Sequence, residues 1–169
     1  MVNGRYPRHH RSEVDVAANA DSLFALLDDH TRLASHMEKP SLMMAGATMQ
    51  VETDELHGQA VGSVIRVTGR VLGMDLGVEE VVTEREPPFR KTWETRGEPR
   101  LLVIDSYRMG FTIAPNGIHS SLAVFIDYQL PLHGSSQWLG HLFGWSYAAW
   151  CTQRMADDAV AAFAGVGGK

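Results

Sequence analysis

The sequence predicts one α+β domain, in which a curved, seven-stranded antiparallel sheet wraps around a long C-terminal helix, with two short helices after the first strand. Three observations carry this prediction. Strand-like alternation recurs from residue 47 to residue 130, short turn signals separate the alternating runs, and one long amphipathic run follows at 137–163. Strands that follow one another through short turns form an antiparallel meander, so these runs and an earlier one belong to one sheet.

The chain begins with a polar and basic stretch that contains Arg8, His9 and His10. Such a stretch is typical of a frayed terminus, so residues 1–10 are expected to form a flexible tail and residues 11–169 a single domain. Residues 13–18 alternate polar and apolar side chains, as a half-buried first strand does.

Two short helices are expected after this strand. Asn19 stands before the amphipathic run at 22–28 and can cap its first turn. Asp29 or Thr31 can cap a second helix over 31–37.

The next six strands are bounded by turn residues, among them Gly73-Met74-Asp75, Pro87-Pro88, Gly97-Glu98-Pro99 and Pro115-Asn116-Gly117. The expected strands are 47–56, 63–72, 76–84, 89–95, 101–113 and 120–130. Ser135 or Ser136 then caps a helix over 137–163, whose length of roughly 40 Å is enough to cross the sheet.

The sequence does not decide which face of strand 101–113 points toward the core. One face carries Asp105, Tyr107 and Met109, and the other carries Ile104 and Arg108. The first choice buries Asp105 and the second buries Arg108, and a charge that points to solvent is the simpler alternative.

A sheet of this width must bury one face, but a single helix about 10 Å across cannot fill the hollow everywhere. The remaining space is expected to form a mainly apolar pocket with a few placed polar groups.

Beyond the order of elements, several segments carry a family resemblance: Val61-Gly62-Ser63, 69–73, 82–88 and Lys91-Thr92-Trp93-Glu94. Over residues 12–164 the chain resembles the helix-grip superfamily (SRPBCC) of START, birch-pollen-allergen and polyketide-cyclase proteins. The resemblance implies a cavity whose mouth is gated by the region of the short second helix. It brings no catalytic signature with it.

Candidate pocket residues form three groups. They are inward-facing strand positions, aromatic, apolar or polar positions of the last helix, and the methionines near the expected mouth. The set is Met37, Met43, Met44, Trp93, Asp105, Tyr107, Arg108, Tyr128, Leu142, Trp145 and Ser146. For each, ordinary core packing or a surface position is the competing interpretation. Trp93 should face inward with Lys91 on the same side.

Composition excludes several function classes. The net charge of −5 and the absence of a basic cluster within the domain argue against nucleic acid as a partner. The single cysteine, Cys151, and the lack of a signal or membrane-spanning stretch favour a cytoplasmic protein without stable membrane insertion. The eight histidines show no zinc spacing, and no nucleotide-binding glycine pattern occurs, so no metal or cofactor is expected.

The leading expectation is therefore binding or transport of a small hydrophobic molecule, such as a lipid, polyketide, quinone or aromatic compound. A polyketide cyclase or aromatase that uses the same cavity is the first alternative, with Asp105, Arg108, Tyr128 or His141 as acid or base. A co-chaperone-like protein-binding domain is the second. Aromatic side chains on several faces of the last helix would also suit a homodimer contact.

Overall fold

The computed structural model describes residues 5–33, 48–71, 73–132 and 136–165, and these residues form a helix-grip fold. The elements follow the predicted order of one strand, two short helices, six strands and one long helix. They are β1 (Arg8–Val16), α1 (Ala20–Asp28), α2 (His30–Leu33), β2 (Thr48–Thr53), β3 (Val64–Val71), β4 (Met74–Glu86), β5 (Arg90–Arg100), β6 (Tyr107–Asn116), β7 (His119–Tyr128) and α3 (Ser136–Ala164).

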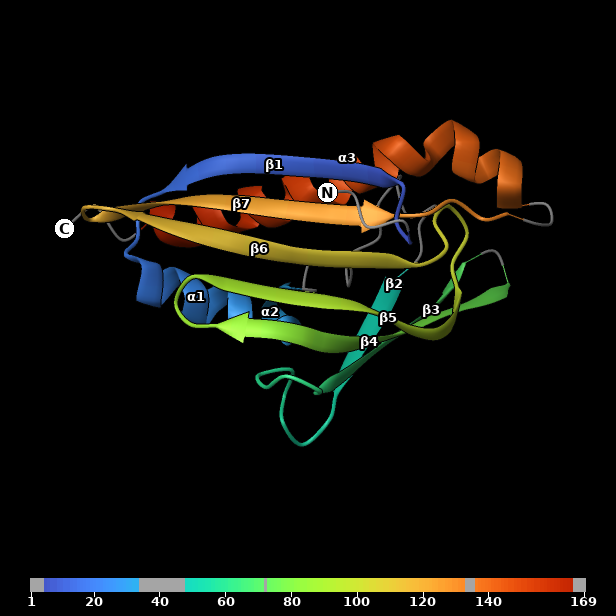
Figure 1. Ribbon diagram of the computed structural model, residues 1–169, viewed down its shortest axis with the longest axis horizontal. Helices are drawn as coiled ribbons and strands as arrows, with labels where there is room; N and C mark the ends of the chain where they lie inside the picture. The colour runs from blue at the N-terminus through green and yellow to red at the C-terminus, as the bar shows by residue number, and fades with distance from the viewer. Residues whose placement is uncertain (1–4, 34–47, 72, 133–135, 166–169) are drawn as a thin grey trace.

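The seven strands form one antiparallel sheet in the order β1-β7-β6-β5-β4-β3-β2 (Figure 1). The register of β4 against β5 shifts at 77–79 and again at 82–84. Such irregularities bend a strand and increase its twist, which gives the sheet its curvature. α3 packs mainly against β1 and β7, while α1 packs against β6 and β7 and α2 against β2. The main helix contacts therefore leave the inner faces of β3, β4 and β5 less covered than those of β1 and β7.

The predicted caps of the two short helices are confirmed. The side chain of Asn19 accepts a hydrogen bond from the backbone N–H of Ser22 at 2.8 Å. Asp29 accepts from the N–H of Thr31 at 3.0 Å, at the start of α2. These bonds fix where the chain turns from β1 into the helices, and with it the position of His30 at the start of α2.

The first strand begins earlier than the sequence indicates. β1 starts at Arg8, and residues 8–10 pair with residues 126–128 of β7. Tyr6 is buried as well. Charge alone made this stretch resemble a tail, but its backbone completes the hydrogen-bond ladder of β7, and His10 bonds to Thr152 of α3 at 2.9 Å.

The prediction of one strand over 101–113 is wrong for its first six residues. β5 continues to Arg100, through the predicted turn at 97–99, and β6 begins only at Tyr107. Residues 101–106 form an irregular connection that approaches α3 closely at two glycines. A Cβ atom at Gly140 would lie 3.0 Å from the backbone oxygen of Val103, and one at Gly144 would lie 3.7 Å from the same oxygen and 2.5 Å from Leu130, which follows β7. Small residues at these helix positions let the connection pack against α3.

None of the helices within the described residues is both long and apolar enough to cross a membrane.

Candidate functional site

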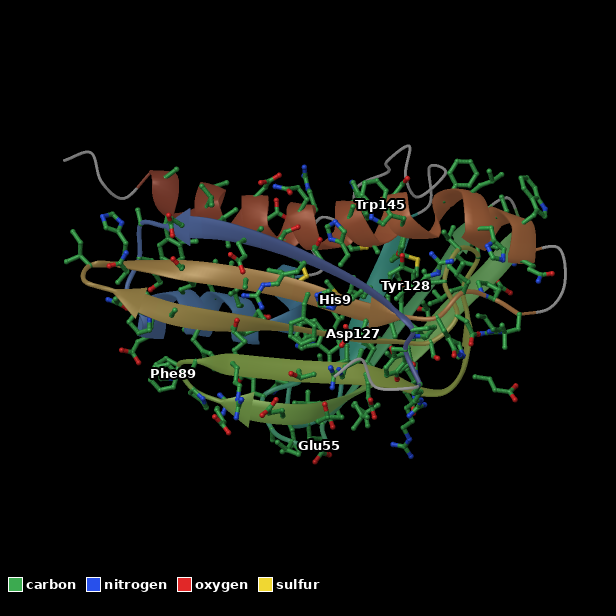
Figure 2. All side chains as sticks on the ribbon, turned by 45° about the horizontal axis from the view of Figure 1, so that its top comes forward. His9, Glu55, Phe89, Asp127, Tyr128 and Trp145 are labelled. Carbon is green, nitrogen blue, oxygen red and sulfur yellow. The ribbon has the colours of Figure 1, made fainter. Side chains whose placement is uncertain are left out.

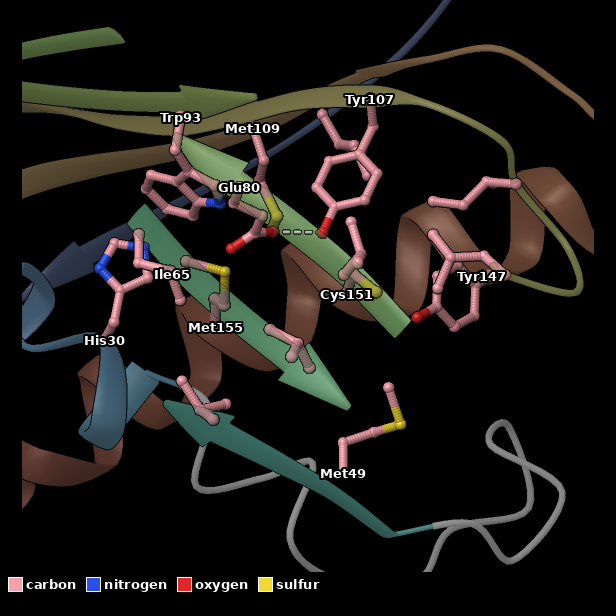
Figure 3. A pocket seen from close by; sticks show the side chains of 16 residues that line it. His30, Met49, Ile65, Glu80, Trp93, Tyr107, Met109, Tyr147, Cys151 and Met155 are labelled. Carbon is pink, nitrogen blue, oxygen red and sulfur yellow. Dashed lines mark hydrogen bonds between the residues drawn. The ribbon is translucent and has the colours of Figure 1, made fainter. Parts of the chain in front are cut away.

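A cavity of about 80 Å³ lies between the concave face of the sheet and α3 (Figure 3). This volume is smaller than the roughly 150 Å³ of a cavity that binds benzene, so a guest of that size requires the lining side chains to move. Its described lining residues are His30, Met49, Val51, Ile65, Val67, Val78, Glu80, Trp93, Leu101, Ile104, Tyr107, Met109, Ile126, Tyr147, Cys151 and Met155. They come from α2, from β2 to β7, from the 101–106 connection and from α3. The cavity therefore lies where α3, held against β1 and β7, leaves β3 to β5 uncovered.

Most of this wall is apolar, and several lining side chains belong to the contiguous hydrophobic core. Three methionines, Met49, Met109 and Met155, are among them. Thioether side chains are flexible and polarizable, so this wall can adapt to the shape of a guest. Polar groups are few, and each has a distinct environment.

Glu80 is the buried acid of the cavity. It lies on the inner face of β4, between Val78 and Val82, and is only 5% exposed. The hydroxyl of Tyr107 and the indole of Trp93 donate hydrogen bonds to its carboxylate. Burial raises the pKa of Glu80 to about 7, although these hydrogen bonds and the charge of Lys91 favour the ionised form. Glu80 can therefore exchange a proton near neutral pH.

His30 is the second polar group. It is the first residue of α2, is buried, and stacks edge-on against Trp93 with ring centroids 4.7 Å apart. Burial, with the nearby Lys91 charge, lowers the pKa of His30 to about 3, so the ring is neutral at physiological pH. Its Nδ1 lies 3.2 Å from Nζ of Lys91, whereas its Nε2 is buried without a hydrogen-bond partner among the described residues.

An ionic cluster of Lys91, Asp28 and Arg85 lies on the Nδ1 side of His30. Lys91 is fully buried on β5, and its ammonium donates to the carboxylate of Asp28 at 2.8 Å and to the backbone oxygen of Asp28 at 2.9 Å. Arg85 binds the same carboxylate at 2.8 Å. Burial opposes ionisation of Asp28, but the hydrogen bonds from Arg85 and Lys91 prevail and lower its pKa. Burial lowers the pKa of Lys91, because its single carboxylate partner does not fully offset the lost hydration.

Cys151 of α3 also faces the cavity. Burial raises the pKa of its thiol to about 12, so the sulfur stays protonated and is a poor nucleophile.

Two of the sequence-selected residues meet at the cavity. Trp93 faces inward with Lys91 on the same side of β5, and Tyr107 lines the wall beside it. The open question about strand 101–113 is thereby answered, because Tyr107 and Met109 point inward. Arg108 points to the outer face, where it binds Asp127 at 2.6 Å.

The remaining selected residues lie elsewhere. Asp105 precedes β6 and accepts a hydrogen bond from the side chain of Gln129 at 2.5 Å. Tyr128 is buried next to α3 but is not among the described lining residues. Leu142 and Trp145 are 63% and 65% exposed, and Trp145 is labelled on α3 in Figure 2. The Trp145 ring makes a T-shaped contact with His10, with ring centroids 5.9 Å apart. Ser146 is half-buried on α3 and also does not appear in the described lining. Met37, Met43 and Met44 lie outside the described residues.

The sequence reasoning missed Glu80, His30 and Tyr147. For Glu80 a signal exists, because Leu76, Val78 and Val82 alternate with it and place an acid on the apolar face of a strand. For His30 and Tyr147 no comparable signal exists, since both depend on how a helix packs over the sheet. Within the parts of the chain that the structure describes, no three His, Cys, Asp or Glu side chains are grouped as metal ligands.

Comparison with known proteins supports the fold. No family model matches the chain, and no curated protein matches it in sequence. Solved structures do match. A norcoclaurine synthase point mutant from Thalictrum flavum, in complex with a transition-state analogue, superposes with a TM-score of 0.66 at 16% identity, covering 95% of this chain and 96% of that one.

Two further structures are similar. The Zhui aromatase/cyclase from Streptomyces sp. R1128 has a TM-score of 0.66 at 15% identity and covers 96% of this chain and 99% of its own. Ara h 8.0201 has a TM-score of 0.59 at 12% identity and covers 91% and 98%. The chain therefore has the same helix-grip fold as these solved structures.

Proposed function

We propose that the protein binds a small, largely hydrophobic molecule in the cavity between the sheet and α3. The strongest support for ligand binding is that the cavity is mainly apolar and carries a few buried polar groups, among them Glu80, Tyr107 and His30. Ligand sites combine an apolar wall with a small number of placed polar groups in this way. The similar structures include one in complex with dopamine and hydroxybenzaldehyde, which supports a small aromatic guest. Transport and lipid binding remain part of the same proposal.

Filling the cavity should weaken ligand binding. Val78 lines the wall and is buried, so Val78→Phe would place a ring in the space that a guest needs. Titration with ethylbenzene or acetophenone, followed by ¹H–¹⁵N NMR, should show affinity reduced at least about tenfold. Val61→Phe is the matched control, because Val61 is 61% exposed and outside the described lining.

The thermal unfolding transition of each variant shows whether it is folded. If folded Val78→Phe binds both probes as tightly as the parent, the guest does not occupy this cavity. Native mass spectrometry of protein purified from its own source then has a specific use, because a carrier can retain its natural ligand.

A catalytic use of the same cavity is the second candidate. Glu80, with a pKa of about 7 in an apolar site, is suited to take or give a proton at a carbonyl-bearing substrate, as a cyclase or aromatase requires. Glu80→Gln separates the two functions. An enzyme should lose turnover and keep substrate binding, whereas a carrier should show no product with either form.

A further inference from the structure

We infer that His30 is a specificity-determining hydrogen-bond donor, and that the cavity prefers a neutral ligand with a carbonyl or hydroxyl oxygen over a hydrocarbon or a carboxylate. This inference rests on the proposed function and names the class of ligand. It is carried by the contacts on the two sides of the imidazole ring.

The contact with Lys91 determines which ring nitrogen carries the proton. An ammonium group has only donors, and the Asp28 backbone oxygen, the other group near the ring that could take a proton from it, already accepts from Nζ of Lys91 at 2.9 Å; we therefore assign Nδ1, which lies 3.2 Å from that Nζ, as the acceptor. In the neutral ring the proton is then on Nε2, which becomes a donor. That Nε2 is buried and has no partner among the described residues.

The donor cannot easily turn away from the cavity. Nδ1 is held by Lys91, whose ammonium is fixed in turn by Asp28. The ring lies edge-on to Trp93 at 4.7 Å, and in Figure 3 it lies at the end of the cavity where Trp93 and Glu80 also lie. A buried donor without an acceptor costs free energy, and a ligand oxygen placed at Nε2 would remove that cost.

The charges around the cavity decide which kind of oxygen fits. None of the described lining residues is Lys or Arg, and the ammonium of Lys91 is already neutralised by Asp28 on the far side of the ring. A carboxylate ligand would enter an apolar space without a cation and would meet the carboxyl group of Glu80. A carbonyl or hydroxyl oxygen brings no net charge, so it can accept from Nε2 without this desolvation cost.

Two conservative variants separate the roles of the two nitrogens. In His30→Asn the side-chain oxygen can take the place of Nδ1 and still accept from Lys91, but no donor reaches the position of Nε2. In His30→Gln the amide nitrogen can reach that position and donate. Acetophenone, ethylbenzene and benzoate are matched probes, because one carries a neutral acceptor, one carries none and one carries a carboxylate.

For the parent, the dissociation constants are expected to show benzoate at least about tenfold weaker than acetophenone. His30→Asn should weaken acetophenone about tenfold while leaving ethylbenzene within about twofold. His30→Gln should restore most of the acetophenone affinity. A merely structural role of His30 would weaken both neutral probes together.

Long-range ¹H–¹⁵N spectra of the parent test the tautomer without any substitution, and should show the His30 proton on Nε2. A proton on Nδ1, an unchanged acetophenone-to-ethylbenzene ratio in His30→Asn, or benzoate bound as tightly as acetophenone would each overturn the inference while the proposed function stands. If none of the three probes binds the parent, the proposed function itself fails.

Discussion

Replacing Asp28 by asparagine should lower the free energy of unfolding by about 3–5 kcal/mol, the range for breaking a buried ion pair from one side. The carboxylate of Asp28 is the common partner of Lys91 and Arg85. The side chain of Lys91 is 0% exposed, so without the carboxylate its charge would be buried and uncompensated. Arg85 is 27% exposed at its side chain and can turn toward water. Urea denaturation at pH 7 measures the loss.

Two further variants test the cause. Lys91→Met should cost less than Asp28→Asn, because Asp28 keeps its hydrogen bonds to Arg85. The double variant should be more stable than the sum of the two single losses implies, since it removes both charges together. Asp75→Asn breaks the exposed pair with Arg70 and should cost less than about 1 kcal/mol. A loss in Asp28→Asn no larger than in Asp75→Asn would contradict the account of this cluster.

The stability of Glu80→Gln relative to the parent should rise by about 2–3 kcal/mol between pH 5 and pH 8. In the folded protein Glu80 has a pKa of about 7, and its ordinary value is 4.5. Folding therefore favours the protonated acid. The parent keeps this contribution in full below pH 4.5 and loses it as the pH rises toward 7, because the unfolded chain ionises first. The amide that replaces the carboxyl group in Glu80→Gln cannot ionise, so the variant escapes the loss.

The free energy of unfolding of the variant must be compared with that of the parent at each pH, because the titration of His30 changes stability in the opposite direction. Its pKa is lowered from 6.5 to about 3, so the parent loses stability as the pH falls from 6.5 toward 3. The two effects partly cancel in the parent alone. Glu79→Gln is the matched control, since the neighbouring carboxylate is half-buried and pairs with Arg66 and Arg96. If the difference in unfolding free energy between Glu80→Gln and the parent rises with pH no more than the difference for Glu79→Gln, Glu80 does not retain its proton in the fold.

The ion-pair and pH experiments also bear on ligand binding. Lys91 connects them, because it holds Nδ1 of His30 on one side and contributes to the electrostatic field at Glu80. A variant that lets Lys91 move should therefore disturb the orientation of the His30 ring and of its Nε2. Asp28→Asn is expected to weaken acetophenone binding even where the protein remains folded.

The order of strands and helices could be predicted because it depends on local signals. Alternation along β3 and β7, the prolines at 87 and 88 and the long apolar stripe of α3 are each set within a few residues by the partition of side chains between water and core. The same alternation placed Trp93 and Lys91 on one side of β5. It was insufficient for strand 101–113, where both faces begin apolar and the first six residues turn out to form a connection that packs against Gly140 and Gly144.

The sequence by itself determined the helix-grip architecture, the inward position of Trp93 and the cap at Asn19, since these follow from neighbouring residues. Only the tertiary structure decided that β1 extends back to Arg8, that Leu142 and Trp145 of α3 face outward, and that Glu80 and His30 share one cavity. The physical reason is distance along the chain. The cavity is whatever space remains after α3 packs against β1 and β7, and that packing brings together residues that no local pattern connects.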